Sequence, residues 1–269
     1  MRNVSLRAVT IALVSGISLM TLSSTLFAEQ RAPHWSYEGE EGPEHWGDLA
    51  DEYIMCSRGV NQSPINLVAD VHADLPQLVF DYYSESILDE VNNGHTIQQN
   101  VQPGSFLRIP DRGVSFALKQ FHFHSPSEHT VNGESFAMEL HFVHADENGA
   151  YGVVGVFIDE GEEHPVLSKM WSFMPENAGE TSVQPIGIEE TDLLPPTREY
   201  FAYAGSLTTP PCSEGVKWMV LKTPIEASAE QIAIFKDRVG PITNRPVQPP
   251  NARVVIDWCS VNPKTSDLT

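Results

Sequence analysis

The sequence predicts a single mainly β domain of the α+β class, in which a mostly antiparallel sheet carries short peripheral helices. Five stretches alternate apolar and other side chains with a period of two. Only two stretches have a convincing helical pattern, and proline and glycine are spread along the chain. Several strands separated by turns, with few helices between them, favour an antiparallel sheet. No internal repeat or linker divides the chain.

The strands follow one another with turn signals between them. Alternation marks strands at Ser115–His124, Phe136–His144, Gly152–Ile158, Val216–Lys222 and Arg253–Trp258. Turn dipeptides such as Asn132-Gly133 lie between the first two strands. The connection is short, so these two strands are expected to be antiparallel neighbours.

Two helices are predicted. Ser228 is a suitable N-cap for a helix over Ala229–Val239, with Gln231 as its capping-box partner and Gly240 as the stop. A shorter helix is expected from Pro165 to Phe173, because proline is favoured in the first helical turn.

The first 28 residues are expected to be a cleaved signal peptide. Arg2 and Arg7 precede a largely apolar stretch from Val9 to Leu22, and small and apolar residues lead to Ala28. The stretch is too short and too interrupted for a membrane anchor. Residues 29–269 then form the domain, in a periplasmic or secreted protein that contacts no membrane after cleavage.

The charge balance excludes some classes of partner. Lys and Arg number 16 against 36 Asp and Glu, which gives a net charge of −20. Such an acidic surface disfavours nucleic acid and anionic lipid. The sequence leaves open whether the protein is a homodimer.

Three cysteines, at 56, 212 and 259, follow the signal peptide. Export brings them into an oxidising compartment, so one disulfide and one remaining thiol are expected. The sequence alone allows three pairings.

Histidines gather on the two predicted neighbouring strands. In the segment QFHFHSPSEHTVNG, Gln120, His122 and His124 share one strand face, because residues two apart point the same way. On the next strand Glu139 and His141 also share a face. Pairing the strands brings His141 beside His122 and His124.

Three neutral imidazoles without a thiolate suit Zn²⁺, and three protein ligands leave a fourth position open for catalysis. Gln120 and Glu139 are placed to hold the far ring nitrogens of these ligands. His144 has the opposite parity from His141 and is expected to be structural.

A second metal pattern overlaps the first. His122, His124 and Glu128 match the H-x-H-x3-E core of a cupin, in which the glutamate is a ligand. Cupins have glycines at fixed flanking positions, where this chain has Phe116 and Ser135. A cupin-type metal enzyme is therefore the weaker interpretation.

The ordered set of motifs resembles the α-class carbonic anhydrases over nearly the whole mature chain. The matching segments are Trp35–Tyr37, Gly42–Trp46, Gln62–Asn66, Asn93–His95, Gln120–Gly133, Glu139–His144, Gly205–Cys212, Asn244–Pro246 and Arg253–Val255. The resemblance implies a large twisted sheet, with His122, His124 and His141 as zinc ligands. It also implies a disulfide between Cys56 and Cys212, as in exported relatives.

The resemblance implies reversible hydration of CO2 to bicarbonate and a proton, by attack of zinc-bound hydroxide on CO2. Glu128 would accept the hydroxyl proton of Thr208, which orients the hydroxide, and His95 would relay the released proton. The implied apolar substrate wall is Val143, Val153, Leu207, Val216 and Trp218, and the implied lining of the proton path is Tyr37, Asn93 and Gln98. The alternative is a non-catalytic binding module of the same fold.

Overall fold

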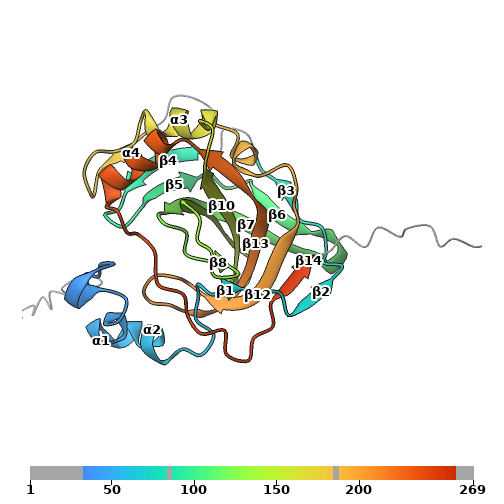
Figure 1. The fold of residues 1–269 in the computed structure, drawn as a ribbon. Helices are drawn as coiled ribbons and strands as arrows, with labels where there is room; N and C mark the ends of the chain where they lie inside the picture. Colours follow the sequence, from blue (N-terminus) through green and yellow to red (C-terminus); the bar gives the residue numbers. More distant parts are fainter. Residues whose placement is uncertain (1–32, 84–86, 184–187, 259–269) are drawn as a thin grey trace, which may run out of the picture. The chain divides into compact units, whose positions relative to one another are not determined.

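The computed structural model describes residues 33–83, 87–183 and 188–258 (Figure 1). The predicted signal peptide and Cys259 lie outside these ranges. The strands are β1 (Asn66–Leu67), β2 (Val71–Ala73), β3 (Val79–Asp81), β4 (Ile87–Asn92), β5 (Ile97–Val101), β6 (Phe106–Ile109), β7 (Val114–His124), β8 (Thr130–Val131), β9 (Met138–Ala145), β10 (Tyr151–Glu160), β11 (Thr181–Ser182), β12 (Tyr200–Ser206), β13 (Glu214–Ala227) and β14 (Ile256–Trp258). The helices are α1 (Trp46–Leu49), α2 (Met55–Arg58), α3 (Pro165–Trp171) and α4 (Ala229–Val239).

One 12-stranded sheet forms the centre of the fold. Its main path runs β11-β4-β5-β7-β9-β10-β13-β12-β14-β2, and β6 pairs with both β3 and β7. Most pairs are antiparallel, but β10 lies parallel to β13 and β14 lies parallel to β2. Strands β1 and β8 make a separate parallel pair. The predicted mainly β class with a mostly antiparallel sheet is confirmed, and the central parallel pair was not foreseen.

The five predicted strands are all present, with shifted ends. Strand β13 extends well beyond the predicted 216–222, whereas β14 keeps only the last three residues of the predicted 253–258. Strands β4, β5 and β12 were missed. In β5 the buried Gln99 occupies a position where an apolar residue would have signalled a strand.

Helix α4 begins and ends as predicted. The Ser228 side chain accepts the backbone N–H of Gln231, and the Gln231 side chain accepts the N–H of Ser228 in return. Gln231 also donates to the His164 carbonyl before α3, which ends two residues earlier than expected. Figure 1 shows α3 and α4 together at one end of the sheet. Helices α1 and α2 have only four residues each, too few for a helical period.

Alternation along the end of β7 separates the core from the site. Phe121 and Phe123 are fully buried, and Phe123 packs edge-on against Trp171 of α3 and near Phe235 of α4. Each buried phenylalanine contributes about 2–3 kcal/mol of hydrophobic stabilisation. His122, between them, and His124, after them, are thereby turned to the opposite face of the sheet.

Candidate metal centre

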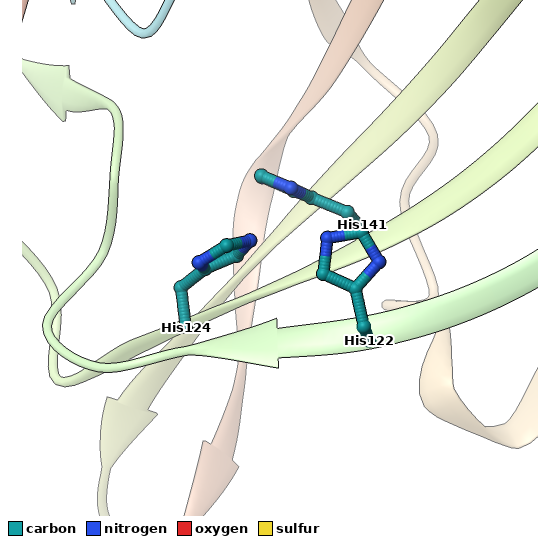
Figure 2. A group of neighbouring side chains, drawn as sticks. All are labelled: His122, His124 and His141. Atoms are coloured by element: carbon teal, nitrogen blue, oxygen red, sulfur yellow. The ribbon is translucent and has the colours of Figure 1, made fainter. Parts of the chain in front are cut away.

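Three histidine rings meet on that opposite face (Figure 2). His122 lies directly across from His141 in the antiparallel pairing of β7 with β9, and His124 is two residues further along β7. One ring nitrogen from each residue lies within 4.8 Å of the others. The predicted convergence of the three imidazoles is therefore present in the structure.

The far nitrogen of each ring is held by a neighbour. His122 Nδ1 lies 2.8 Å from Gln120 Oε1, and His124 Nδ1 lies 2.5 Å from the Thr243 carbonyl oxygen. These two contacts leave the Nε2 atoms of His122 and His124 free. The Nε2 atom of His124 is buried and has no hydrogen-bond partner among the described residues.

In His141 the two ring nitrogens have exchanged roles. Its Nε2 lies 2.9 Å from Glu139 Oε1, and its Nδ1 is the free nitrogen. The three free nitrogens are one Nδ1 and two Nε2 atoms. A buried acceptor without a partner, such as the Nε2 atom of His124, is costly in a folded protein. The cluster therefore fits a divalent metal ion such as zinc.

Burial keeps His122 and His124 neutral. It lowers the pKa of His122 well below 6.5, and the nearby His124 and His141 lower it further. Burial also lowers the pKa of His124, although Glu128 opposes this shift. Because a metal ligand must offer a free lone pair, neutral rings are the form that binds metal.

Glu139 connects the centre to a buried polar chain. Its Oε1 accepts from His141 and from His129 Nδ1 at 2.7 Å, and its Oε2 accepts the backbone N–H groups of Glu128 and His129. Burial raises the pKa of Glu139, but His129 and His141 reverse this effect and hold the pKa well below its ordinary value. The carboxylate is therefore ionised and orients His141.

The next residues of this polar chain were not predicted from the sequence. His129 Nε2 lies 2.6 Å from the Tyr203 hydroxyl, which contacts Ser63 Oγ at 2.8 Å. His129 stood in the histidine-rich segment, but it follows the end of β7, where strand parity gives no guidance. Thr243 was missed because it binds through its backbone carbonyl.

Glu128 is buried next to the histidines. Its Oε1 accepts the backbone N–H of Arg245 at 2.8 Å, whereas its Oε2 lies 3.5 Å from His124 Nε2 and 3.8 Å from His141 Nδ1. Oε2 has no hydrogen-bond partner among the described residues. The expected hydrogen bond from Thr208 is therefore not formed in this structure.

A cavity of about 190 Å³ opens beside His122 and His141. Four of the five residues expected in an apolar wall line it, namely Val143, Val153, Leu207 and Trp218. Thr208 lines the same cavity, as does Tyr151, which was not predicted. Val216 is not among the lining residues and packs behind them in the same apolar cluster. The cavity thus places two of the three imidazoles, those of His122 and His141, beside a small, mostly apolar space.

A family model described as eukaryotic-type carbonic anhydrase matches residues 41–258. The chain belongs to the eukaryotic-type carbonic anhydrase family. A carbonic anhydrase of Klebsiella pneumoniae is 45% identical over 241 residues, which span 90% of this chain and 96% of the relative. One of Neisseria gonorrhoeae is 44% identical over 245 residues, spanning 89% of this chain and 95% of that protein.

Solved structures agree with this membership. An α-carbonic anhydrase from Thermovibrio ammonificans, in complex with sulfanilamide, superposes with a TM-score of 0.81 at 49% identity, covering 84% of this chain and all of that one. Dioscorin complexed with ascorbate superposes with a TM-score of 0.77 at 30% identity, covering 84% of this chain and 99% of its own. The cupin interpretation is wrong, because the fold is that of a carbonic anhydrase.

The residues predicted for proton transfer lie at two places in this carbonic anhydrase. The half-buried His95 ring stacks on Trp35 with centroids 3.7 Å apart, and the Tyr37 ring centroid is 6.4 Å away. Asn93 Oδ1 accepts the backbone N–H of His95. Gln98 instead lies across from His122 in the pairing of β5 with β7.

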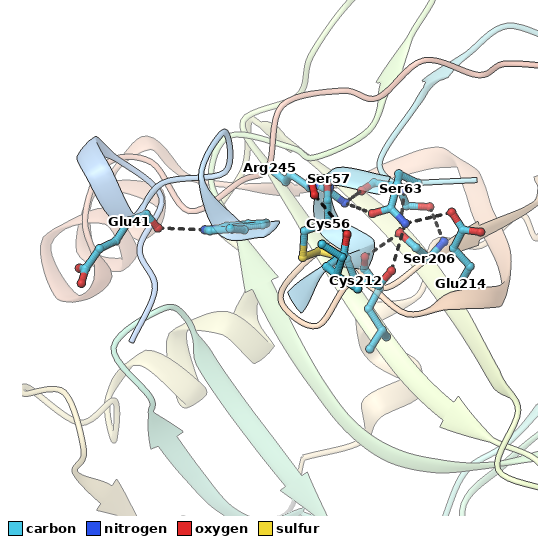
Figure 3. Close-up of a disulfide and its surroundings, with 12 residues drawn as sticks. Glu41, Cys56, Ser57, Ser63, Ser206, Cys212, Glu214 and Arg245 are labelled. Carbon is cyan, nitrogen blue, oxygen red and sulfur yellow. Dashed lines mark hydrogen bonds between the residues drawn. A yellow bond between two sulfur atoms is a disulfide. The ribbon is translucent and has the colours of Figure 1, made fainter. Parts of the chain in front are cut away.

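The predicted disulfide is present between Cys56 and Cys212, with Cα atoms 5.0 Å apart (Figure 3). Buried Arg245 donates to the Cys56 carbonyl and to Gln62, and Gln62 donates to the Cys212 carbonyl. Cys212 closes a tight turn with Thr209, next to Thr208. The disulfide therefore anchors the loop that lines the cavity.

Among the described residues, no helix combines the length and apolar character needed to cross a bilayer.

Proposed function

We propose that this protein catalyses the reversible hydration of CO2 to bicarbonate and a proton, with zinc held by His122, His124 and His141. The observation that carries the proposal is the meeting of three imidazole nitrogens within 4.8 Å of one another, beside a cavity with an apolar wall that His122 and His141 line. Membership of the carbonic anhydrase family supports it. Zinc, when bound, lowers the pKa of water enough to supply hydroxide at neutral pH.

The protein's own contribution begins with ring orientation. Gln120, the Thr243 carbonyl and Glu139 each engage one far nitrogen, so the three lone pairs are aimed before any metal arrives. Preorganised rings reduce the entropy lost on binding. The Glu139 carboxylate also makes His141 a more basic ligand.

The apolar wall suits CO2, which is small and nonpolar. Val143, Val153 and Trp218 line the cavity that reaches His141, and an apolar wall there would hold CO2 next to the hydroxide that zinc would supply. Their close packing explains the limited volume of the cavity. Leu207 completes the wall from the loop after β12.

We assign Thr208 a positioning role. A hydroxyl has one proton to donate, so a threonine that donates to a carboxylate can only accept from the attacking hydroxide and thereby orients it. Glu128 is the suitable carboxylate, because its Oε2 has no hydrogen-bond partner among the described residues. We predict that Thr208→Val lowers kcat/KM while the protein keeps its metal.

Proton release is assigned to His95. Its ring is half-buried on Trp35, and burial together with His34 lowers its pKa from 6.5. The ring is therefore neutral at pH 7 and free to accept a proton. Tyr37 and Asn93, which lie close to it, and Gln98, beside His122, are proposed to line the path.

The test is CO2 hydration by stopped flow, with metal content measured on the same samples. We expect activity with one zinc per chain, its loss with a chelator and its return with zinc. His122→Ala should lose both metal and activity, whereas the exposed His72→Ala should keep both. A folded protein with one zinc per chain and no hydration above background would favour the non-catalytic binding module.

Glu128→Gln separates ligand from positioning roles. If Glu128 positions Thr208, the variant keeps one zinc per chain and loses turnover. Loss of the metal would show that the carboxylate is a ligand. Sulfanilamide, which the Thermovibrio enzyme binds, is expected to inhibit the wild-type protein.

Export is proposed from residues 1–28. The Cys56–Cys212 disulfide supports an oxidising compartment such as the periplasm. Sequencing the N-terminus of the protein recovered from the periplasm or the medium should give Glu29 as the first residue.

A further inference from the structure

A second cavity, of about 390 Å³, lies on the sheet face turned away from the histidines. Its walls come from β12, β13, β14 and the beginning of β7. Along β13, Trp218 lines both cavities and its ring centroid lies 4.9 Å from that of His141, whereas Lys217 and Met219 on either side of it line the second cavity only. The two cavities therefore share a strand and open on opposite faces.

The interior of this second cavity is apolar. Phe116 and Met219 are buried in its floor, and Ala202 and Ile256 form partly exposed walls. Val254 at its edge is 51% exposed, which is unusual for a valine that lines a concave surface. The volume lies within the range of about 300–1,000 Å³ found for small-molecule sites.

Two cations lie at this apolar cavity in an otherwise acidic protein. Lys217 Nζ lies 5.1 Å from the centre of the Phe116 ring, and Arg112 lines the cavity from the turn after β6. Both side chains are on exposed residues, and neither forms an ion pair within the described ranges. Acidic residues outnumber basic ones 36 to 16, so the chain has more than enough carboxylates to pair with every Lys and Arg. The lack of an ion pair at Lys217 and Arg112 is therefore not a consequence of the composition.

Tyr200 and Arg112 line the same cavity, and the charge of Arg112 affects the pKa of Tyr200. Burial raises the pKa of the Tyr200 phenol to about 12, and the positive field of Arg112 opposes this shift. The phenol donates to the Pro76 carbonyl, which belongs to the same cavity. The charge of the Arg112 guanidinium therefore reaches Tyr200, a buried residue of the same cavity.

We propose that this cavity binds a small amphipathic anion, namely a carboxylate on an unbranched apolar chain of roughly ten carbons, a size that suits pockets of this class. The chain packs on Phe116 and Met219, and the carboxylate is bound by Lys217 and Arg112. Charge complementarity selects this occupant. A second copy of the protein would bring its own Lys217 and Arg112 and a further net charge of −20 to the same patch.

The probe is decanoate, titrated calorimetrically into the zinc-loaded protein, with decanol and decyltrimethylammonium as matched neutral and cationic probes. Decanoate is expected to bind one to one with a Kd below about 1 mM. Decanol should bind at least threefold more weakly and the cation not measurably. Lys217→Gln and Arg112→Gln should each weaken decanoate about three- to tenfold.

Charge-matched controls are Lys236→Gln and Arg58→Gln, which remove one cation each away from the cavity. Both should leave the decanoate affinity unchanged. Ala202→Trp should fill the cavity and abolish binding, and Lys217→Glu provides an exposed alternative if that variant fails to fold. CO2 hydration should be unchanged in Lys217→Gln, which separates this site from the metal centre.

Several results would overturn the proposal. Absence of decanoate binding, equal affinity for decanol, or equal weakening by the control variants would each do so. Decanoate binding that is unchanged in Lys217→Gln and Arg112→Gln but lost in His122→Ala would place decanoate at the metal centre instead. Decanoate binding that appears only when a dimer is dissociated would identify a second copy of the chain as the occupant.

Discussion

Ser63 and Ser206 hydrogen-bond each other reciprocally. The Ser63 N–H donates to Ser206 Oγ at 2.9 Å, and the Ser206 N–H donates to Ser63 Oγ at 3.0 Å. Ser206 lies two residues before Thr208, and the pair joins the end of β12 to the segment that follows Cys56. Together with the Cys56–Cys212 disulfide, it fixes the cavity loop to the rest of the domain at two points (Figure 3).

Removing the disulfide should destabilise the protein and loosen this loop. The two cysteines are 156 positions apart, and closing so long a loop stabilises a fold by about 5 kcal/mol in the chain-entropy account, an upper figure. We expect Cys56→Ser/Cys212→Ser to lower the free energy of unfolding by about 3–5 kcal/mol in urea titrations. Cys259→Ser is the matched control. An unchanged melting temperature after verified reduction would contradict the expectation.

Loss of His95 should slow proton release without slowing CO2 interconversion. His95→Ala is expected to lower kcat in weak buffer by about 10- to 100-fold, with recovery on adding imidazole. Oxygen-18 exchange between CO2 and bicarbonate at equilibrium should keep its interconversion rate. Since burial and His34 lower the pKa of His95, the wild-type kcat should fall along a titration centred below pH 6.5. Equal loss in both steps without rescue would remove His95 from the relay.

Stability should decrease in acid because of His144. Its Nδ1 contacts the Gly152 carbonyl and its Nε2 contacts the Tyr82 hydroxyl, and burial lowers its pKa from 6.5 to about 4. The unfolded chain therefore binds the proton more readily. The resulting decrease in the free energy of unfolding is absent above pH 6.5. It grows as the pH falls towards 4, where it reaches about 3 kcal/mol.

The pH effect is measured as the free energy of unfolding of the chelated protein between pH 7 and pH 4.5. His144→Gln cannot titrate and should show a flatter pH dependence than the wild-type chain, whatever its absolute stability. Parallel curves for the two proteins would show that His144 does not carry the effect.

Replacing Glu139 should weaken metal binding. Glu139→Gln removes the charge that holds His141 and His129, and such changes cost about 10- to 100-fold in affinity. Competition with a chromogenic chelator measures the zinc Kd directly. Glu44→Gln, an exposed carboxylate, is the control. Unchanged zinc affinity would mean that Glu139 serves the fold alone.

Strand periodicity predicted the central features of the site because the metal centre lies on regular backbone. His122 and His124 share a face by the two-residue period, and a short turn brings His141 beside them. The same reasoning fails at Phe116, which by parity alone would share their face. A register shift between Leu118 and Gln120 turns Phe116 to the core side instead, and no residue type announces that shift.

Other contacts depend on the assembled chain. Thr243 supplies a backbone carbonyl, which the sequence does not distinguish from any other carbonyl. His129 reaches Tyr203, 74 residues away, through a partnership that exists only once β12 is beside the centre. The parallel pairing of β10 with β13 likewise depends on the crossover between them. The sequence alone allowed three disulfide pairings. The resemblance to carbonic anhydrases selected the pairing of Cys56 with Cys212, which the structure contains.

The alternation of side chains along β13 determines which residues can be substituted to change each of the two cavities. Substitutions at Lys217 or Met219 would remodel the second cavity only, whereas substitutions at Trp218 would change the lining of both cavities. The second cavity could therefore be altered at Lys217 and Met219 while the wall beside His141 is kept, provided that no residue is inserted into or deleted from β13. A shift of the register of β13 by one residue would turn each of its side chains to the opposite face of the sheet and would disrupt both cavities.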